Sequence, residues 1–125
     1  MSSGHVLLID DDHSSRRAFT RVLEIRGFTV TTARRGAEAL EVMRSADEVD
    51  VIVLDLMMPE VSGWEVRERQ LEEGILPDVP VVVFSGTSGD LVEEQIALEA
   101  ADHLVKPVGP TALCEMVEQY CDDES

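Results

Sequence analysis

Basic residues are scarce in this sequence: ten Lys and Arg stand against 26 Asp and Glu, and the formal net charge is −16. Proteins that bind nucleic acid neutralise phosphates with Lys and Arg, and anionic membrane surfaces attract the same residues. The charge balance therefore argues against both partners. No apolar run is long enough to cross a membrane, and residues 1–5 lack the hydrophobic region of a signal peptide, so we expect a cytoplasmic protein.

Cysteine is also rare, with only Cys114 and Cys121 near the C-terminus. Helical spacing places the two thiols on roughly one face of a helix, too far apart for a disulfide within it, so we expect a reduced, partly buried pair. No Cys and His stand at the spacing of a zinc site. What the chain does have is 44% hydrophobic residues in 125, which is typical of one ordinary globular domain.

Short apolar or β-branched runs alternate with segments of helical periodicity along the whole chain. The runs predict strands at residues 5–9, 28–32, 51–55, 80–84 and 103–105. Helices are predicted to follow them, at about residues 14–26, 36–45, 64–73, 90–100 and 111–120. Ser14 or Ser15 can cap the first helix, and Ser88 or Asp90 the fourth. Such alternation predicts an α/β fold: a doubly wound, flavodoxin-like parallel sheet in the order 2-1-3-4-5, with helices on both faces.

Acidic residues stand where two of these strands end. The run Val51–Leu54 ends in Asp55, after which Pro59 stops regular structure and Gly63 precedes the next helix. The first strand ends in Asp10 and Asp11, followed by Asp12. In the predicted strand order the first and third strands are neighbours at the topological switch point, where ligands of such sheets bind. We therefore expect these acids to meet at one edge of the sheet.

Clustered carboxylates predict a cation, because like charges at close range oppose joint ionisation. Oxygen ligands completed by water or phosphate favour Mg²⁺. The alternative is that residues 10–12 are a solvated helix start, where acids are favoured. Ser85 and Lys106 end two further strands and add a hydroxyl and a positive charge, although Lys106 could also be a free surface lysine. A carboxylate nucleophile, a metal, a hydroxyl and a lysine are together suited to accept a phosphoryl group on Asp55.

Four motifs make the chain resemble the receiver domains of bacterial two-component response regulators: V-L-L-I-D-D-D, V-L-D-L-M-M-P-E-V-S-G, P-V-V-V-F-S-G and H-L-V-K-P. They stand in the expected order and cover the chain from about Val6 to Tyr120. The resemblance implies a single receiver domain over residues 1–125, with a core of about 5–121 and no output domain in this sequence. It implies a switch that is phosphorylated by a histidine kinase or phosphotransfer protein and signals through the fourth helix, fifth strand and fifth helix. Such a protein catalyses only its own phosphorylation and slow autodephosphorylation.

The resemblance also implies roles for individual residues. Asp55 would be the phosphorylated aspartate, and Mg²⁺ would be bound by Asp55, Asp10, Asp11 and the backbone carbonyl of Met57. Asp12 would lie beside the metal without binding it. Two residues would complete the site: Ser85, whose hydroxyl turns toward the phosphoryl group, and Lys106, its cationic partner. The peptide bond from Lys106 to Pro107 would be cis.

The chain departs from the family pattern at several positions. His103 stands where an aromatic switch residue is usual, and a ring that titrates near neutrality could still move between buried and exposed positions. The usual Gly-Ala before the fifth strand is Glu99-Ala100. Met57 and Thr87 occupy the two positions that, in this family, tune how readily water attacks the phosphoaspartate. Neither side chain carries a carboxylate or an amide that could orient water, so we expect a fairly long-lived phosphorylated state.

The C-terminal half of the chain is acidic and the first predicted helix carries arginines, so the two regions favour different partners. Residues 88–125 contain ten acids and one base, Lys106, which opposes a symmetric dimer through this half. A downstream partner with a basic surface, a dimer built elsewhere, or a merely solvated face are the alternatives. The family resemblance implies that the phosphodonor docks on the first helix, which carries Arg16, Arg17 and Arg21. The alternative is that these arginines only make the helix surface soluble.

Two other classes compete with a phosphorylated switch. Phosphatases of the haloacid dehalogenase type also use Asp, Ser or Thr, Lys and Mg²⁺, but their nucleophile follows the first strand and they need a later acidic pair. A receiver-like binding module without phosphorylation is the second alternative. Stoichiometric labelling of Asp55 distinguishes the switch from both.

Overall fold

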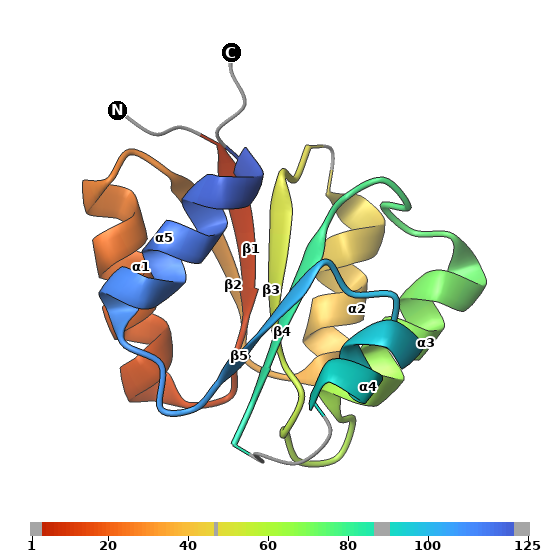
Figure 1. Cartoon of the computed structure of the whole chain (residues 1–125). Coiled ribbons are helices and arrows are strands. Elements are labelled where there is room, and N and C mark those ends of the chain that lie inside the picture. Colours follow the sequence, from red (N-terminus) through yellow and green to blue (C-terminus); the bar gives the residue numbers. More distant parts are fainter. Residues whose placement is uncertain (1–3, 47, 87–90, 122–125) are drawn as a thin grey trace.

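A single parallel sheet forms the centre of the protein, whose computed structural model describes residues 4–46, 48–86 and 91–121 (Figure 1). Its strands are β1 (His5–Ile9), β2 (Thr29–Ala33), β3 (Val51–Asp55), β4 (Val81–Ser85) and β5 (Asp102–Val105). The strand order is β2-β1-β3-β4-β5 and every pairing is parallel, which confirms the predicted fold class. The helices are α1 (His13–Ile25), α2 (Gly36–Ser45), α3 (Gly63–Glu73), α4 (Leu91–Ala97) and α5 (Pro110–Cys121).

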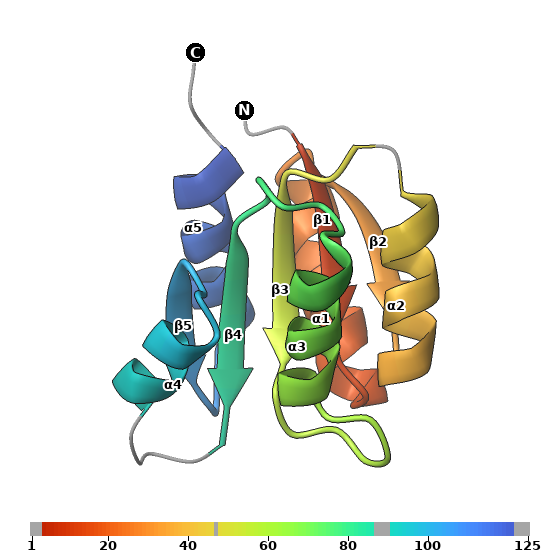
Figure 2. The ribbon, with the colours of Figure 1, turned by 90° about the vertical axis from the view of Figure 1, so that its right-hand side faces the viewer.

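Helices cover both faces of the sheet, with α1 and α5 on one face and α2, α3 and α4 on the other (Figures 1 and 2). Alternate residues of β3 therefore enter two different cores. Ile52 and Leu54 pack toward α2 and α3, whereas Val51 and Val53 pack toward α1 and α5. All residues of β3 and β4 are buried, which explains why the sequence shows continuous apolar runs at these strands.

Several element boundaries differ from the prediction. Helix α1 begins at His13, and its N-cap is Asp12, whose carboxylate accepts a hydrogen bond of 2.8 Å from the Ser15 amide. The prediction of Ser14 or Ser15 as the cap is wrong, because the extended backbone at Asp12 already brings an acceptor to the first turn. Helix α4 ends at Ala97, before the predicted residue 100, and Glu99 has a left-handed φ of 54°. The predicted caps Ser88 and Asp90 lie outside the described residues.

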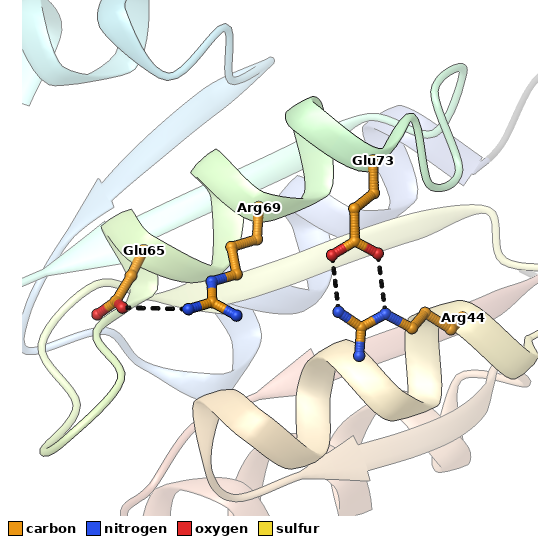
Figure 3. Close-up of polar contacts among 4 residues, drawn as sticks. All are labelled: Arg44, Glu65, Arg69 and Glu73. Carbon is orange, nitrogen blue, oxygen red and sulfur yellow. Dashed lines mark hydrogen bonds and ion pairs between the residues drawn. The ribbon is translucent and has the colours of Figure 1, made fainter.

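Exposed ion pairs lie between α2 and α3 and within α3. Arg44 of α2 donates two hydrogen bonds, of 2.9 and 2.7 Å, to Glu73 of α3, while Arg69 lies 4.0 Å from Glu65 within α3 (Figure 3). Because these side chains are 41–54% exposed and solvent screens their charges, each pair contributes little to the stability of the fold. Within the described part of the chain, no helix combines the length and apolar character needed to cross a membrane. Cys114 and Cys121 do not form a disulfide.

Candidate functional site

The acids at the ends of β1 and β3 meet at one edge of the sheet. These strands are neighbours, with Ile9 opposite Leu54, so the residues that follow both strands lie side by side. One carboxylate oxygen each of Asp10, Asp11 and Asp55 lies within 4.8 Å of the others. Asp10 and Asp55 are 1% and 0% exposed, whereas Asp11 is exposed. The cluster is thus two buried carboxylates with a third at the solvent boundary.

Among the residues that the structure describes, hydrogen-bond donors reach one oxygen of each buried carboxylate and not the other. Asp10 Oδ1 accepts a bond of 3.0 Å from the Asp12 amide, and Asp55 Oδ1 accepts one of 3.0 Å from the Met57 amide. No hydrogen-bond donor among the described residues reaches Oδ2 of Asp10 or of Asp55, although both atoms are buried. A buried acceptor without a partner is costly. Two such oxygens beside Asp11 are the ligand set that a hard divalent cation prefers, so the residues present fit Mg²⁺.

The ionisation of the two buried acids points the same way. Burial raises the pKa of Asp10 from 3.8 to about 7, against the opposing effect of the Asp12 amide, and the charge of Asp55 raises it further. Burial also raises the pKa of Asp55, while the hydrogen bonds from Lys106 and the Met57 amide lower it. Two neighbouring carboxylates in a desolvated site resist joint ionisation. A bound dication would remove that resistance.

Lys106 supplies the positive charge of this site. It follows β5, and its Nζ atom lies 2.9 Å from Asp55 Oδ1 and 5.2 Å from the centre of the Phe84 ring. Its backbone amide donates a hydrogen bond of 2.8 Å to the carbonyl of Ser85, and the bond to Pro107 is cis. Lys106 is therefore not a free surface lysine. The ammonium group of Lys106 lies over the ring of Phe84, a cation–π contact that the strand pattern does not predict.

Ser85 ends β4 at the same edge and is fully buried. Its strand neighbour Phe84 stands opposite Asp55, and Ser85 itself stands opposite Val105, immediately before Lys106. Parallel pairing thus brings the serine, the lysine and the aspartate to adjacent strand ends. Met57 lies just beyond β3 and is 47% exposed.

Gly63 lets α3 begin directly against the end of β3. A Cβ atom at this position would lie 2.3 Å from the Asp55 carbonyl oxygen and 2.5 Å from the Leu56 Cα, distances that real Cβ atoms do not adopt. The Gly63 amide donates a hydrogen bond of 3.0 Å to the Leu56 carbonyl. Because it has no side chain, Gly63 allows the loop of residues 56–62 to return close to Asp55. The glycine before this helix is the sequence feature that indicates the close approach.

His103 lies outside the carboxylate cluster. It is half-buried on β5 opposite Val83, and its Nδ1 atom shares a hydrogen bond with Oε1 of Gln95 on α4. Gln95 also donates a hydrogen bond of 3.2 Å to the Ala101 carbonyl. The ring thus links β5 to α4, a contact that the sequence did not predict. Thr87 lies outside the described residues.

A comparison with known protein families matches residues 6–118 to the response regulator receiver domain. The chain belongs to this family. Receiver domains of two-component response regulators receive a phosphoryl group and bind Mg²⁺ at an acidic pocket.

Curated relatives of this receiver domain are response regulators from bacteria and plants. Response regulator MprA of Mycobacterium ulcerans is 41% identical over 108 residues, which cover 84% of this chain and 44% of MprA. Two-component response regulator ORR3 of Oryza sativa subsp. indica is 35% identical over 117 residues, which cover 90% of this chain and 89% of ORR3. The chain thus spans less than half of one relative and nearly all of the other.

Solved structures share the fold across almost the whole receiver domain. The chemotaxis response regulator CheY4 of Vibrio cholerae has a TM-score of 0.85 and 28% identity, and the match covers 95% of this chain and 99% of that one. TrrA of Thermotoga maritima, solved in complex with Mg²⁺ and BeF, has a TM-score of 0.80 and 26% identity, with 94% and 98% covered.

Proposed function

We propose that this receiver domain is a signalling switch that is phosphorylated on Asp55 in the presence of Mg²⁺. One observation carries the proposal: the buried Asp55 carboxylate is bonded to Lys106 at 2.9 Å and shares a cluster with Asp10 and Asp11. The structure of TrrA with Mg²⁺ and BeF supports the same chemistry at a receiver domain of this fold.

Each residue of the site has a distinct task in this proposal. Asp10, Asp11, Asp55 and the Met57 carbonyl would hold Mg²⁺, which when bound neutralises phosphoryl oxygens and withdraws charge from the cluster. An oxygen of the ionised Asp55 attacks phosphorus in line while the bond from phosphorus to the donor's nitrogen or oxygen breaks, which leaves an acyl phosphate on Asp55. No general base is required because the nucleophile carries no proton. Lys106 and the Ser85 hydroxyl then contact the transferred group.

The phosphodonor would dock on α1, which carries three arginines in a chain of formal net charge −16. A groove of about 790 Å³ is lined by Arg16, Arg17 and Arg21, with Glu24 as its acid and Thr32 of β2 beside them. Arg16 is half-buried and donates a hydrogen bond of 2.9 Å to the Asp10 carbonyl, so it also joins α1 to the metal-binding edge. Arg17 and Arg21 are exposed and make no ion pair with any described acid. A histidine kinase or phosphotransfer protein with an acidic surface fits this groove.

The output surface would be the face formed by α4, β5 and α5. Ser85 and His103 lie on adjacent strands, and His103 contacts Gln95, so movement at the phosphorylation site can reach α4 through these residues. Ile96 and Val105 expose apolar side chains on this face, 71% and 46% respectively. A downstream protein with an apolar contact area and a basic rim is the expected partner.

Beryllofluoride with Mg²⁺ tests the phosphoacceptor role, because it mimics an acyl phosphate on an ionised aspartate. In ¹H–¹⁵N NMR spectra we expect Mg²⁺-dependent shifts at the ends of β1, β3 and β4, and at β5. The Asp55→Asn variant should bind none, since its amide cannot replace the carboxylate. Absence of shifts in the wild type would favour the binding-module alternative, and continuous hydrolysis of a phosphate ester would favour the phosphatase.

A further inference from the structure

Arg67 is buried in the middle of α3, and none of the acids that the structure describes forms an ion pair with it. It is 7% exposed. Burial lowers the pKa of Arg67, an effect that the charge of Glu99 partly offsets. A buried cation is costly unless its donors are satisfied. The hydrogen bonds that satisfy it show what the residue does.

The guanidinium donates to the backbone at the end of α4. Nε donates a hydrogen bond of 2.8 Å to the Leu98 carbonyl, and Nη2 donates one of 2.9 Å to the Glu99 carbonyl. Carbonyls at a helix C-terminus lack partners within the helix, and the negative end of the helix dipole favours a cation there. Arg67 therefore caps α4 from a neighbouring helix.

This helix end needs such a cap more than most. Glu99 has a φ of 54°, a left-handed conformation that favours glycine and strains other residues. The backbone amide of Glu99 donates a hydrogen bond of 3.1 Å to the Ile96 carbonyl. The backbone amide of Ala100 donates one of 2.9 Å to the Gln95 carbonyl. The turn thus keeps the hydrogen bonds of a glycine-ended helix although it has no glycine. The bonds from Arg67 offset that strain.

A second buried side chain holds the guanidinium in position. Gln70, one turn along α3 and 1% exposed, accepts a hydrogen bond of 2.8 Å from Arg67 Nη1. The side-chain Nε2 of Gln70 in turn donates a hydrogen bond of 3.1 Å to the Ile75 carbonyl. The start of α3 is fixed in turn, because Gly63 packs on the backbone of Asp55. The end of α4 is therefore connected to the phosphoacceptor strand through packed and hydrogen-bonded groups of α3.

We propose that Arg67 is a positioning residue that fixes the C-terminal end of α4 to α3 in both the unphosphorylated and the phosphorylated receiver domain. The turn at residues 98–100 is then the immobile end of the helix that Gln95 connects to His103. Rearrangement at His103 acts on α4 against this fixed point. The part that concerns the phosphorylated form rests on the proposed function.

Amide hydrogen exchange of Glu99 and Ala100 tests the cap in the protein without beryllofluoride. In Arg67→Lys, which keeps the charge but loses the forked donors, we expect exchange at these two amides to be at least about tenfold faster. Amides of β1 and β3 should change less than about twofold, which excludes general destabilisation. Arg67→Met should show the same pattern more strongly. Unchanged protection of both amides in Arg67→Lys would overturn the proposal.

Arg69→Gln is the matched control. Arg69 lies two residues further along α3, its side chain is 54% exposed, and its guanidinium lies 4.0 Å from the Glu65 carboxylate (Figure 3). Removing its charge should leave exchange at Glu99 and Ala100 unaltered. Equal acceleration in this variant would show that charge on α3, and not the cap, protects the turn, and would contradict the proposal.

The same amides measured with saturating Mg²⁺ and beryllofluoride test the second half. A fixed end predicts that Glu99 and Ala100 keep their wild-type protection to within about twofold after binding. Loss of their protection would show that the cap opens on activation and would overturn this half. If beryllofluoride fails to bind at all, the proposed function and this half fall together, while the measurements without beryllofluoride still decide the cap.

Discussion

The pKa of Asp10 makes the affinity for Mg²⁺ depend on pH in a calculable way. This pKa is raised to about 7 in the metal-free protein, chiefly by burial, and the metal must displace the proton. Roughly nine in ten Asp10 carboxyls hold a proton at pH 6 and roughly one in ten at pH 8. The apparent Kd for Mg²⁺ should therefore fall about tenfold between these values, which equals about 1.4 kcal/mol. The raised pKa of Asp55 acts in the same direction.

Isothermal titration calorimetry with Mg²⁺ measures both consequences. Comparing two buffers of different ionisation enthalpy at pH 7 should show release of about half a proton per bound ion. Asp10→Asn should weaken binding and reduce the pH dependence to the part that Asp55 contributes. The matched control is Asp12→Asn, because asparagine also caps helices and Asp12 is outside the carboxylate cluster. A Kd in the wild type that is constant to within about twofold from pH 6 to pH 8 would refute the reasoning.

Three substitutions test other parts of the account. Gly63→Ala forces a Cβ to within 2.3 Å of the Asp55 carbonyl, so chemical denaturation should show a loss of about 1–3 kcal/mol and weaker Mg²⁺ binding; an unchanged midpoint would contradict the close packing. Lys106→Met removes the cation 2.9 Å from Asp55 and should slow labelling by acetyl phosphate about tenfold or more, as followed by intact mass; wild-type rates would exclude a role for the amine. Arg44→Gln breaks an exposed, solvent-screened ion pair and should leave the midpoint of thermal unfolding almost unchanged, so a large fall in the midpoint would contradict the small contribution assigned to this pair.

The residues of the candidate site were predictable because they follow strands. Continuous apolar runs identify buried parallel strands, and parallel pairing brings their carboxyl ends to one edge of the sheet. Asp10, Asp55, Ser85 and Lys106 are each at or directly after such an end. Their meeting therefore follows from strand order alone. Sequence could not supply the hydrogen bonds, since these depend on side-chain positions within about 1 Å.

The parts that sequence did not predict depend on contacts between distant segments. Arg67 stands in a helix with few apolar residues and is expected to be exposed, yet the carbonyls of Leu98 and Glu99 bury it. The sequence around Arg67 gives no indication that its side chain is buried. A signal does exist at Glu99, which occupies the place of a usual glycine and takes a glycine's conformation. The cap of α1 was misassigned because Asp12 and Ser15 are both good capping residues, and only the backbone angles decide between them.

Phosphorylation by acetyl phosphate tests the central claim most directly. The protein is incubated with acetyl phosphate, with and without Mg²⁺, and the modified peptide is identified by mass spectrometry. The account predicts one phosphoryl group per chain, on Asp55, only when Mg²⁺ is present, and no label in Asp55→Asn. A phosphoryl group on another residue, equal labelling after Mg²⁺ is chelated, or normal labelling of Asp55→Asn would contradict it.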